Sequence, residues 1–169
     1  MNWTNLIKSD IEETYRATEK LVKMVDASAL GWRPQTGSNW MTTAQLLEHI
    51  TSACGMCVQG FVTGKWPPPP PDGGGMLPPA EKMTSARSVD ETLKKLAADK
   101  KLALDMLAQA GESELANRQV SAPWDPTPKP LGKLCLEMVG HLANHKAQLF
   151  YYLKLQGKPV NTMNFYGMG

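Results

Sequence analysis

Apolar residues recur at three- and four-residue steps along most of this chain. From Trp3 to Val25 they mark one face of an amphipathic helix, and charged side chains fill the opposite face. We find no segment that alternates apolar and polar residues as a half-buried strand would. The pattern predicts an all-α protein with four helices, over residues 3–25, 42–60, 88–110 and 131–156.

Local signals support the boundaries of these helices. Thr42 with Gln45, and Ser88 with Glu91, have the spacing of a capping box, in which two side chains satisfy the first backbone N–H groups. Glycines are expected to end the third and fourth helices, at Gly111 and Gly157.

The connectors between the predicted helices are long and rich in proline. The connector over residues 63–87 contains Pro67–Pro71 and is long enough to cross a whole helix. The next helix could then run parallel to the previous one, which favours an up-down-down-up four-helix bundle in a single domain over residues 1–169. The proline run is also typical of a ligand for SH3 or WW domains, although a spanning loop is the simpler interpretation.

Composition excludes several classes of protein. The 169 residues carry a net charge of only +2, with a pI of about 8.4, so we expect no nucleic-acid partner. The polar N-terminus does not resemble a signal peptide, and no apolar run is long enough to span a membrane. Three cysteines cannot form a closed disulfide framework, so we expect a cytoplasmic protein.

The three histidines of the chain fall on two of the predicted helices. His141 and His145 are four residues apart in the fourth helix, so they lie about 40° apart on one face, beside the apolar stripe. His49 borders the apolar stripe of the second helix in the same way. Three imidazoles that converge from two helices suit a divalent ion and leave coordination positions open. The alternative is that they are ordinary core side chains with satisfied hydrogen bonds.

Other polar and thiol side chains near these positions have more than one interpretation. Gln148 follows His145 by one turn and could orient a ligand, or could be a solvated amide. Glu48 and Glu137 could accept an imidazole N–H, but surface ion pairs are the simpler expectation. Cys54 and Cys57 form a C-x-x-C past the middle of a predicted helix, which favours inert core thiols over a redox pair.

A structural zinc site built from the cysteines is a weaker alternative. It would join Cys54 and Cys57 to Cys135 and a histidine, but the chain has no second close cysteine pair. Four tryptophans in the connectors could wall a pocket over the metal or cap the ends of the bundle, and capping is the simpler interpretation. They are Trp32, Trp40, Trp66 and Trp124.

Two short motifs resemble the DinB/YfiT-like family of metal-binding helical bundles. They are the segment W-M-T-T-A-Q-L-L-E-H-I over residues 40–50 and the segment G-H-L-A-N-H-K-A-Q-L over residues 140–149. The family pattern has one histidine on the second helix and an H-x-x-x-H pair on the fourth. These match His49, His141 and His145 one for one.

The resemblance implies a fold, a metal and a class of chemistry. It implies an up-down-down-up bundle that often dimerises, with a bound zinc, nickel, iron or manganese ion. Characterised relatives are transferases or isomerases that use a low-molecular-weight thiol such as bacillithiol or mycothiol. We therefore expect a homodimeric metal-dependent enzyme that activates water or such a thiol on a small-molecule substrate, of transferase, isomerase or hydrolase type. The alternative is a non-enzymatic binding or interaction bundle with a structural metal.

Overall fold

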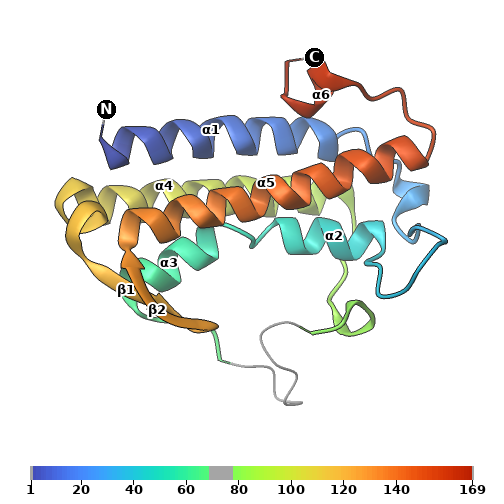
Figure 1. The fold of residues 1–169 in the computed structure, drawn as a ribbon. Helices are drawn as coiled ribbons and strands as arrows, with labels where there is room; N and C mark the ends of the chain where they lie inside the picture. The colour runs from blue at the N-terminus through green and yellow to red at the C-terminus, as the bar shows by residue number, and fades with distance from the viewer. Residues whose placement is uncertain (1, 69–77, 169) are drawn as a thin grey trace.

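The structure, a computed structural model, describes residues 2–68 and 78–168, and helices dominate it (Figure 1). The long helices are α1 (Trp3–Val22), α4 (Val89–Asn117) and α5 (Leu131–Leu155), and the shorter ones are α2 (Thr43–Ile50), α3 (Gly55–Thr63) and α6 (Thr162–Phe165). Two 3₁₀ turns, Ala27–Ala29 and Ala80–Lys82, and strands β1 (Gln119–Ala122) and β2 (Asp125–Pro130) complete the fold. The predicted, mostly helical class is confirmed. Most of the Pro67–Pro71 run lies outside the described residues.

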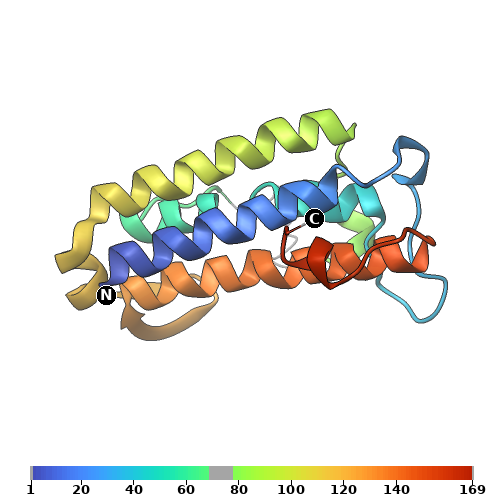
Figure 2. The same ribbon diagram turned by 90° about the horizontal axis from the view of Figure 1, so that it is seen from above.

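The helices pack around one apolar core. α1, α4 and α5 lie side by side along most of their length, and α2 and α3 lie end to end along the remaining side (Figures 1 and 2). Both α1 and α3 pack against α4 and against α5. All five of these helices contribute large, fully buried side chains, namely Ile7, Ile11, Tyr15, Leu21, Leu46, Leu47, Ile50, Phe61, Leu107, Leu115, Leu131 and Leu142.

Helix α1 begins where its first backbone donors find acceptors. The side chain of Asn2 accepts from the N–H of Asn5, and the carboxylate of Glu112 on α4 accepts from the N–H groups of Trp3 and Thr4 at 3.1 and 3.0 Å. The helix ends at Val22, three residues before the predicted end at residue 25. Its start is therefore fixed by a residue more than 100 positions away in the chain.

The single helix predicted over residues 42–60 is in fact two helices. The capping box of Thr42 and Gln45 starts α2 as predicted, but α2 ends at Ile50 and α3 begins at Gly55. Just after α2, the Thr51 hydroxyl donates to the carbonyl of Glu48 and so competes with the helical ladder. A Cβ at Gly55 would lie 2.1 Å from the backbone oxygen of Asp99, so the second half of the segment approaches α4 closely only because residue 55 is glycine.

Helix α4 is longer than predicted. Ser88 is its N-cap, as expected, because its side chain accepts from the N–H of Glu91. Gly111, expected to end the helix, has a left-handed φ of +69° and kinks the chain, but helical turns resume as far as Asn117. The guanidinium of Arg118, the next residue, donates to the carbonyls of Phe61 and Val62 and so ties α4 to the end of α3.

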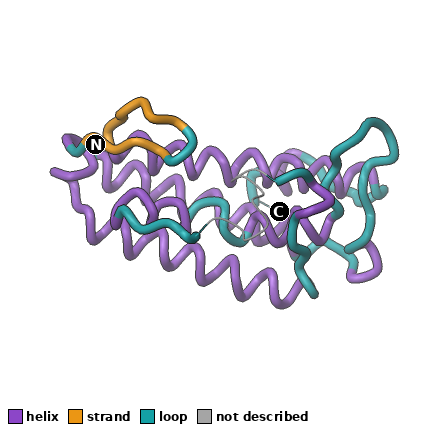
Figure 3. The backbone as a smooth tube through the Cα atoms, turned by 90° about the horizontal axis from the view of Figure 1, so that it is seen from below, coloured by secondary structure: helices purple, strands orange, loops and turns teal. Residues whose placement is uncertain are grey.

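The connector after α4 forms an antiparallel ribbon of two strands. The sequence predicts no strand here, because it shows no alternating pattern. Gln119 pairs with Pro130, Val120 with Lys129 and Ala122 with Asp125. The prolines of β2 stand at every second residue, 126, 128 and 130. Alternate N–H groups of an antiparallel strand point away from its partner, so these prolines cost the ribbon few hydrogen bonds. Figure 3 places the ribbon at the end of the molecule where the chain begins.

Helix α5 ends near the predicted residue, and a further short helix follows it. Gly157 adopts a φ of +81° just after the helix, as expected for its C-terminal glycine. The chain then returns over the bundle, where α6 contacts α1 (Figure 1). Among the described residues, no helix has both the length and the apolar character needed to cross a bilayer.

Candidate metal centre

The three histidines come from two neighbouring helices. His49 lies one residue before the end of α2, and His141 and His145 lie one turn apart in the middle of α5. One ring nitrogen from each lies within 4.8 Å of the others, and all three side chains are half-buried. The structure therefore brings together the three residues selected from the sequence, in a group that could hold a metal ion.

The spacing of the ring nitrogens fits a small divalent ion. The Nε2 atom of His145 lies 2.9 Å from Nε2 of His49 and 2.8 Å from Nε2 of His141. Zinc binds imidazole nitrogen at about 2.0–2.1 Å, so two nitrogens on one ion lie about 2.9–3.4 Å apart for angles between octahedral and tetrahedral. The two distances from His145 lie at the short end of this range, and the third pair, His49 and His141, lies within 4.8 Å.

The other nitrogens of the α5 pair are held by oxygen acceptors. Nδ1 of His141 lies 3.1 Å from the backbone carbonyl of Ala53, and Nδ1 of His145 lies 2.6 Å from Oε1 of Gln148. Because these oxygens can only accept, each Nδ1 carries the proton and each Nε2 presents a lone pair. Two lone pairs 2.8 Å apart repel each other unless a cation lies between them, so the proton arrangement itself favours a cation at this point.

Burial keeps these rings neutral. Burial, together with the charges that His145 and His141 would carry, lowers the pKa of His49 to about 4. Burial also lowers the pKa of His141 and of His145, although the bond to Gln148 partly opposes this shift in His145. Neutral imidazole is the form that binds a metal.

The structure separates the three candidate orienting residues. Gln148 contacts His145 directly, as the interpretation that it orients a ligand requires. Glu48 instead pairs with Lys95 on α4, at 2.9 and 3.0 Å. Glu137 pairs with Lys129 and Lys133, so both glutamates form the expected surface ion pairs.

The cysteines occupy positions that differ from the prediction. Because α2 and α3 are separate, Cys54 is the N-cap of α3, and the C-x-x-C stands at a helix N-terminus rather than past the middle of a helix. Burial nevertheless raises the pKa of all three thiols, to about 11 for Cys57 and about 12 for Cys135. The thiols therefore stay protonated, as expected of core cysteines. The alternative zinc site of Cys54, Cys57 and Cys135 has no support, because the histidine cluster is the only metal-ligand group of three in residues 2–68 and 78–168.

The four connector tryptophans lie in two groups away from one another. Trp32 and Trp40 pack edge-on against Tyr152, near the end of α5. Trp66 and Trp124 pack against Phe61 and against each other, near the end of α3. These contacts fit the simpler interpretation, in which the tryptophans cap the packed helices.

The Ala53 carbonyl is the site group that the sequence did not reveal. It lies in the break between α2 and α3, and a backbone acceptor has no signature in a helical pattern. The only available signal was Gly55, because glycine within a predicted helix often marks an interruption.

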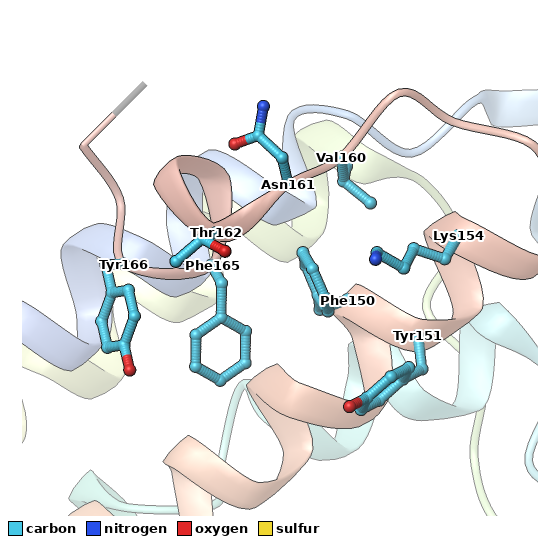
Figure 4. A pocket seen from close by; sticks show the side chains of 8 residues that line it. All are labelled: Phe150, Tyr151, Lys154, Val160, Asn161, Thr162, Phe165 and Tyr166. Atoms are coloured by element: carbon cyan, nitrogen blue, oxygen red, sulfur yellow. The ribbon is translucent and has the colours of Figure 1, made fainter.

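A separate pocket of about 390 Å³ lies between α5 and α6 (Figure 4). Its lining combines aromatic rings with the cationic side chain of Lys154, and none of the three histidines belongs to it. The lining residues are Phe150, Tyr151, Lys154, Val160, Asn161, Thr162, Phe165 and Tyr166.

Comparisons with known proteins agree with the fold. Over 97% of this chain and 98% of the other, the structure superposes with a TM-score of 0.67 on the crystal structure of a candidate DinB family member from Exiguobacterium sibiricum 255-15. The two sequences are 14% identical, so this likeness shows a shared fold. No curated protein matches the chain. The model of the DinB superfamily matches residues 10–149. Because this family model covers most of the chain, the chain belongs to the DinB superfamily.

Proposed function

We propose that His49, His141 and His145 hold one divalent metal ion, and that the protein is a metal-dependent enzyme acting on a small molecule. The observation that carries the metal site is the 2.8 Å approach of two Nε2 atoms whose Nδ1 atoms both face oxygen acceptors. A cation relieves the repulsion between these two lone pairs. Zinc, nickel, iron and manganese all accept imidazole nitrogen, so the donor set admits each of them.

The residues of the chain give this site a catalytic rather than a structural pattern. Three neutral histidines leave coordination positions free, whereas structural zinc sites are usually closed by four protein ligands. A divalent ion bound there would supply Lewis-acid chemistry, namely the polarisation of a water or of a low-molecular-weight thiol. Ala53 and Gln148 would keep both α5 rings in the tautomer that directs Nε2 at the ion.

We also propose that residues 1–169 form one domain, an up-down-down-up four-helix bundle in which α2 and α3 together count as one interrupted helix. Figure 1 supports this topology, because α1 and α5 run in one direction along the molecule while α2, α3 and α4 run in the other. The homodimer and the cytoplasmic location expected from the sequence stay predictions.

A non-enzymatic bundle with a bound metal is the second candidate. In the described part of the chain, Nδ1 of His141 contacts a backbone carbonyl and Nδ1 of His145 contacts the amide of Gln148. Neither can transfer a proton near neutral pH, so these two contacts supply no general acid or base. A screen for metal-dependent transfer of a low-molecular-weight thiol separates the two candidates, since turnover excludes the non-enzymatic one.

The metal site is tested by elemental analysis of protein purified without a histidine tag, because the chain has only three histidines of its own. We expect one equivalent of metal in the wild type grown in metal-replete medium. The His141→Ala variant should lose it, and the control Asn144→Ala, which changes an exposed residue between the two α5 ligands, should keep it. Wild-type protein without stoichiometric metal would refute the proposal.

A further inference from the structure

We propose that Asp99 on α4 is a positioning residue for the metal centre and acts through the break between α2 and α3. This inference rests on the proposed metal site and extends it to a residue whose hydrogen bonds go to α1 and α3 rather than to a histidine.

The break first creates unpaired donors, and Asp99 accepts from them. The N-cap of α3, Cys54, makes no side-chain capping bond. Instead, Oδ2 of Asp99 accepts from the N–H of Gly55 and Oδ1 accepts from the N–H of Met56, both at 2.9 Å. A carboxylate from another helix therefore caps α3, where a residue of α3 itself would ordinarily do so.

The capping carboxylate is held in place by its surroundings. The phenol of Tyr15 on α1 donates to Oδ2 of Asp99 at 2.6 Å, and the two side chains are 2% and 6% exposed. The close approach of Gly55 to the backbone of Asp99 leaves the start of α3 little room to move. Three elements, α1, α3 and α4, thus meet at one buried carboxylate.

The same break also creates an unpaired acceptor, which serves the metal centre. In an unbroken helix the carbonyl of Ala53 would accept from the N–H of Cys57. Here it faces α5 and accepts from Nδ1 of His141 at 3.1 Å, and Ala53 is only 1% exposed. Since Ala53 lies two residues before Gly55, the anchoring of Gly55 and Met56 on Asp99 fixes the direction of the carbonyl that orients His141.

This arrangement makes the two α5 histidines differ in their dependence on Asp99. His141 is oriented by a group whose position depends on Asp99. His145 is oriented by Gln148, which lies one turn away on the same helix. A loss of Asp99 should therefore disturb His141 and leave His145 unchanged, whereas a general loosening of the fold would affect both alike.

The first measurement is the affinity of untagged protein for Zn²⁺ in competition with a chromophoric chelator. Removal of an orienting group typically weakens metal binding tenfold or more, so we expect Asp99→Ala to lose about tenfold. Asp99→Asn should lose less, because its single carbonyl oxygen can still cap one N–H. Two controls on the same helix should keep wild-type affinity: Asp105→Asn removes an exposed charge, and Leu107→Ala lowers thermal stability two turns away.

The second measurement distinguishes positioning from folding. Long-range ¹H–¹⁵N spectra of the Zn²⁺-loaded protein should show faster exchange of the Nδ1 proton of His141 in Asp99→Ala, with that of His145 unchanged. Where Asp99→Ala does not fold, Asp99→Asn decides by the same criteria. Wild-type affinity in the variant, or equal changes at both histidines, overturns this inference alone. Wild-type protein that fails to bind Zn²⁺ refutes the proposed function as well.

Discussion

At the scale of single residues, the key property of the histidine cluster is which ring nitrogen of each imidazole carries the proton. Nδ1 of His145 is bound to the amide of Gln148, and Nδ1 of His141 to a backbone carbonyl. Neutral imidazole has one proton, so the position of that proton decides which nitrogen can serve as a ligand. The neighbours of these rings therefore determine which ring nitrogens present lone pairs to one another inside the cluster.

Gln148→Ala should weaken metal binding without unfolding the protein. Gln148 is exposed, so its loss leaves no cavity, but Nδ1 of His145 loses its acceptor at 2.6 Å and the ring can rotate or change tautomer. We expect about a tenfold rise in the dissociation constant for Zn²⁺, measured by chelator competition. The neighbouring variant Asn144→Ala is the control, and equal affinities for the two variants would contradict an orienting role for Gln148.

Sequence pattern identified the histidines because of simple helical geometry. Because they are four residues apart in a helix, His141 and His145 share one face beside an apolar stripe, and His49 borders the apolar stripe of its own helix. The three side chains converge wherever these two stripes pack together. Gln148 could be proposed for the same reason. The acceptor of His141 could not, because the carbonyl of Ala53 is available only where the helix is interrupted.

At the scale of secondary-structure elements, helix ends were predictable where a nearby side chain caps them. Thr42 and Ser88 start their helices as expected, and Gly157 follows the end of α5. The interruption between α2 and α3 was not predicted, because the group that stabilises it, Asp99, lies more than 40 residues away in sequence and Gly55 was the only local signal. The ribbon was missed because alternate prolines conceal its strand pattern.

The start of α1 predicts a pH dependence that can be tested. The pKa of Glu112 is lowered below its ordinary value of 4.5. The cause is hydrogen bonding from the backbone N–H groups of Thr4 and Trp3 and from the Thr4 hydroxyl. A carboxylate with a lowered pKa in the folded state contributes stability above its ordinary pKa, and that contribution is lost as the pH falls through the folded-state value.

Glu112→Gln should therefore reduce the free energy of unfolding at pH 7 and reduce it less as the pH falls below about 4.5. Urea unfolding at a series of pH values measures the difference between the two proteins. Glu12→Gln, which changes an exposed glutamate on α1, serves as the control for a simple loss of charge. A difference that stays constant with pH would exclude the capping role of Glu112.

At the scale of the whole molecule, the proposed ion would connect the interrupted side of the bundle to α5. The contact from His49 to His145 joins residues 96 positions apart in the chain. A ligand that binds only the folded state stabilises it by an amount that grows with concentration, about 2.7 kcal/mol at a hundredfold excess over the dissociation constant.

Zn²⁺ should accordingly raise the midpoint of urea unfolding of the metal-free wild type in a concentration-dependent way. Mg²⁺ prefers oxygen ligands and should have little effect at the same concentration. His49→Ala should remove most of the response to Zn²⁺. An unchanged wild-type midpoint at saturating Zn²⁺ would mean that the histidines do not hold an ion in the folded state.

The separation of His49 from its two partners also sets an order of events during synthesis. At about 5–20 residues per second, a ribosome takes roughly 5–20 seconds to pass from the first histidine to the last. During that interval a nascent chain has a single imidazole on α2 and no complete site. Capture of the proposed ion would therefore have to wait until His145 on α5 has left the exit tunnel, later than the folding of α1 and α2 could begin.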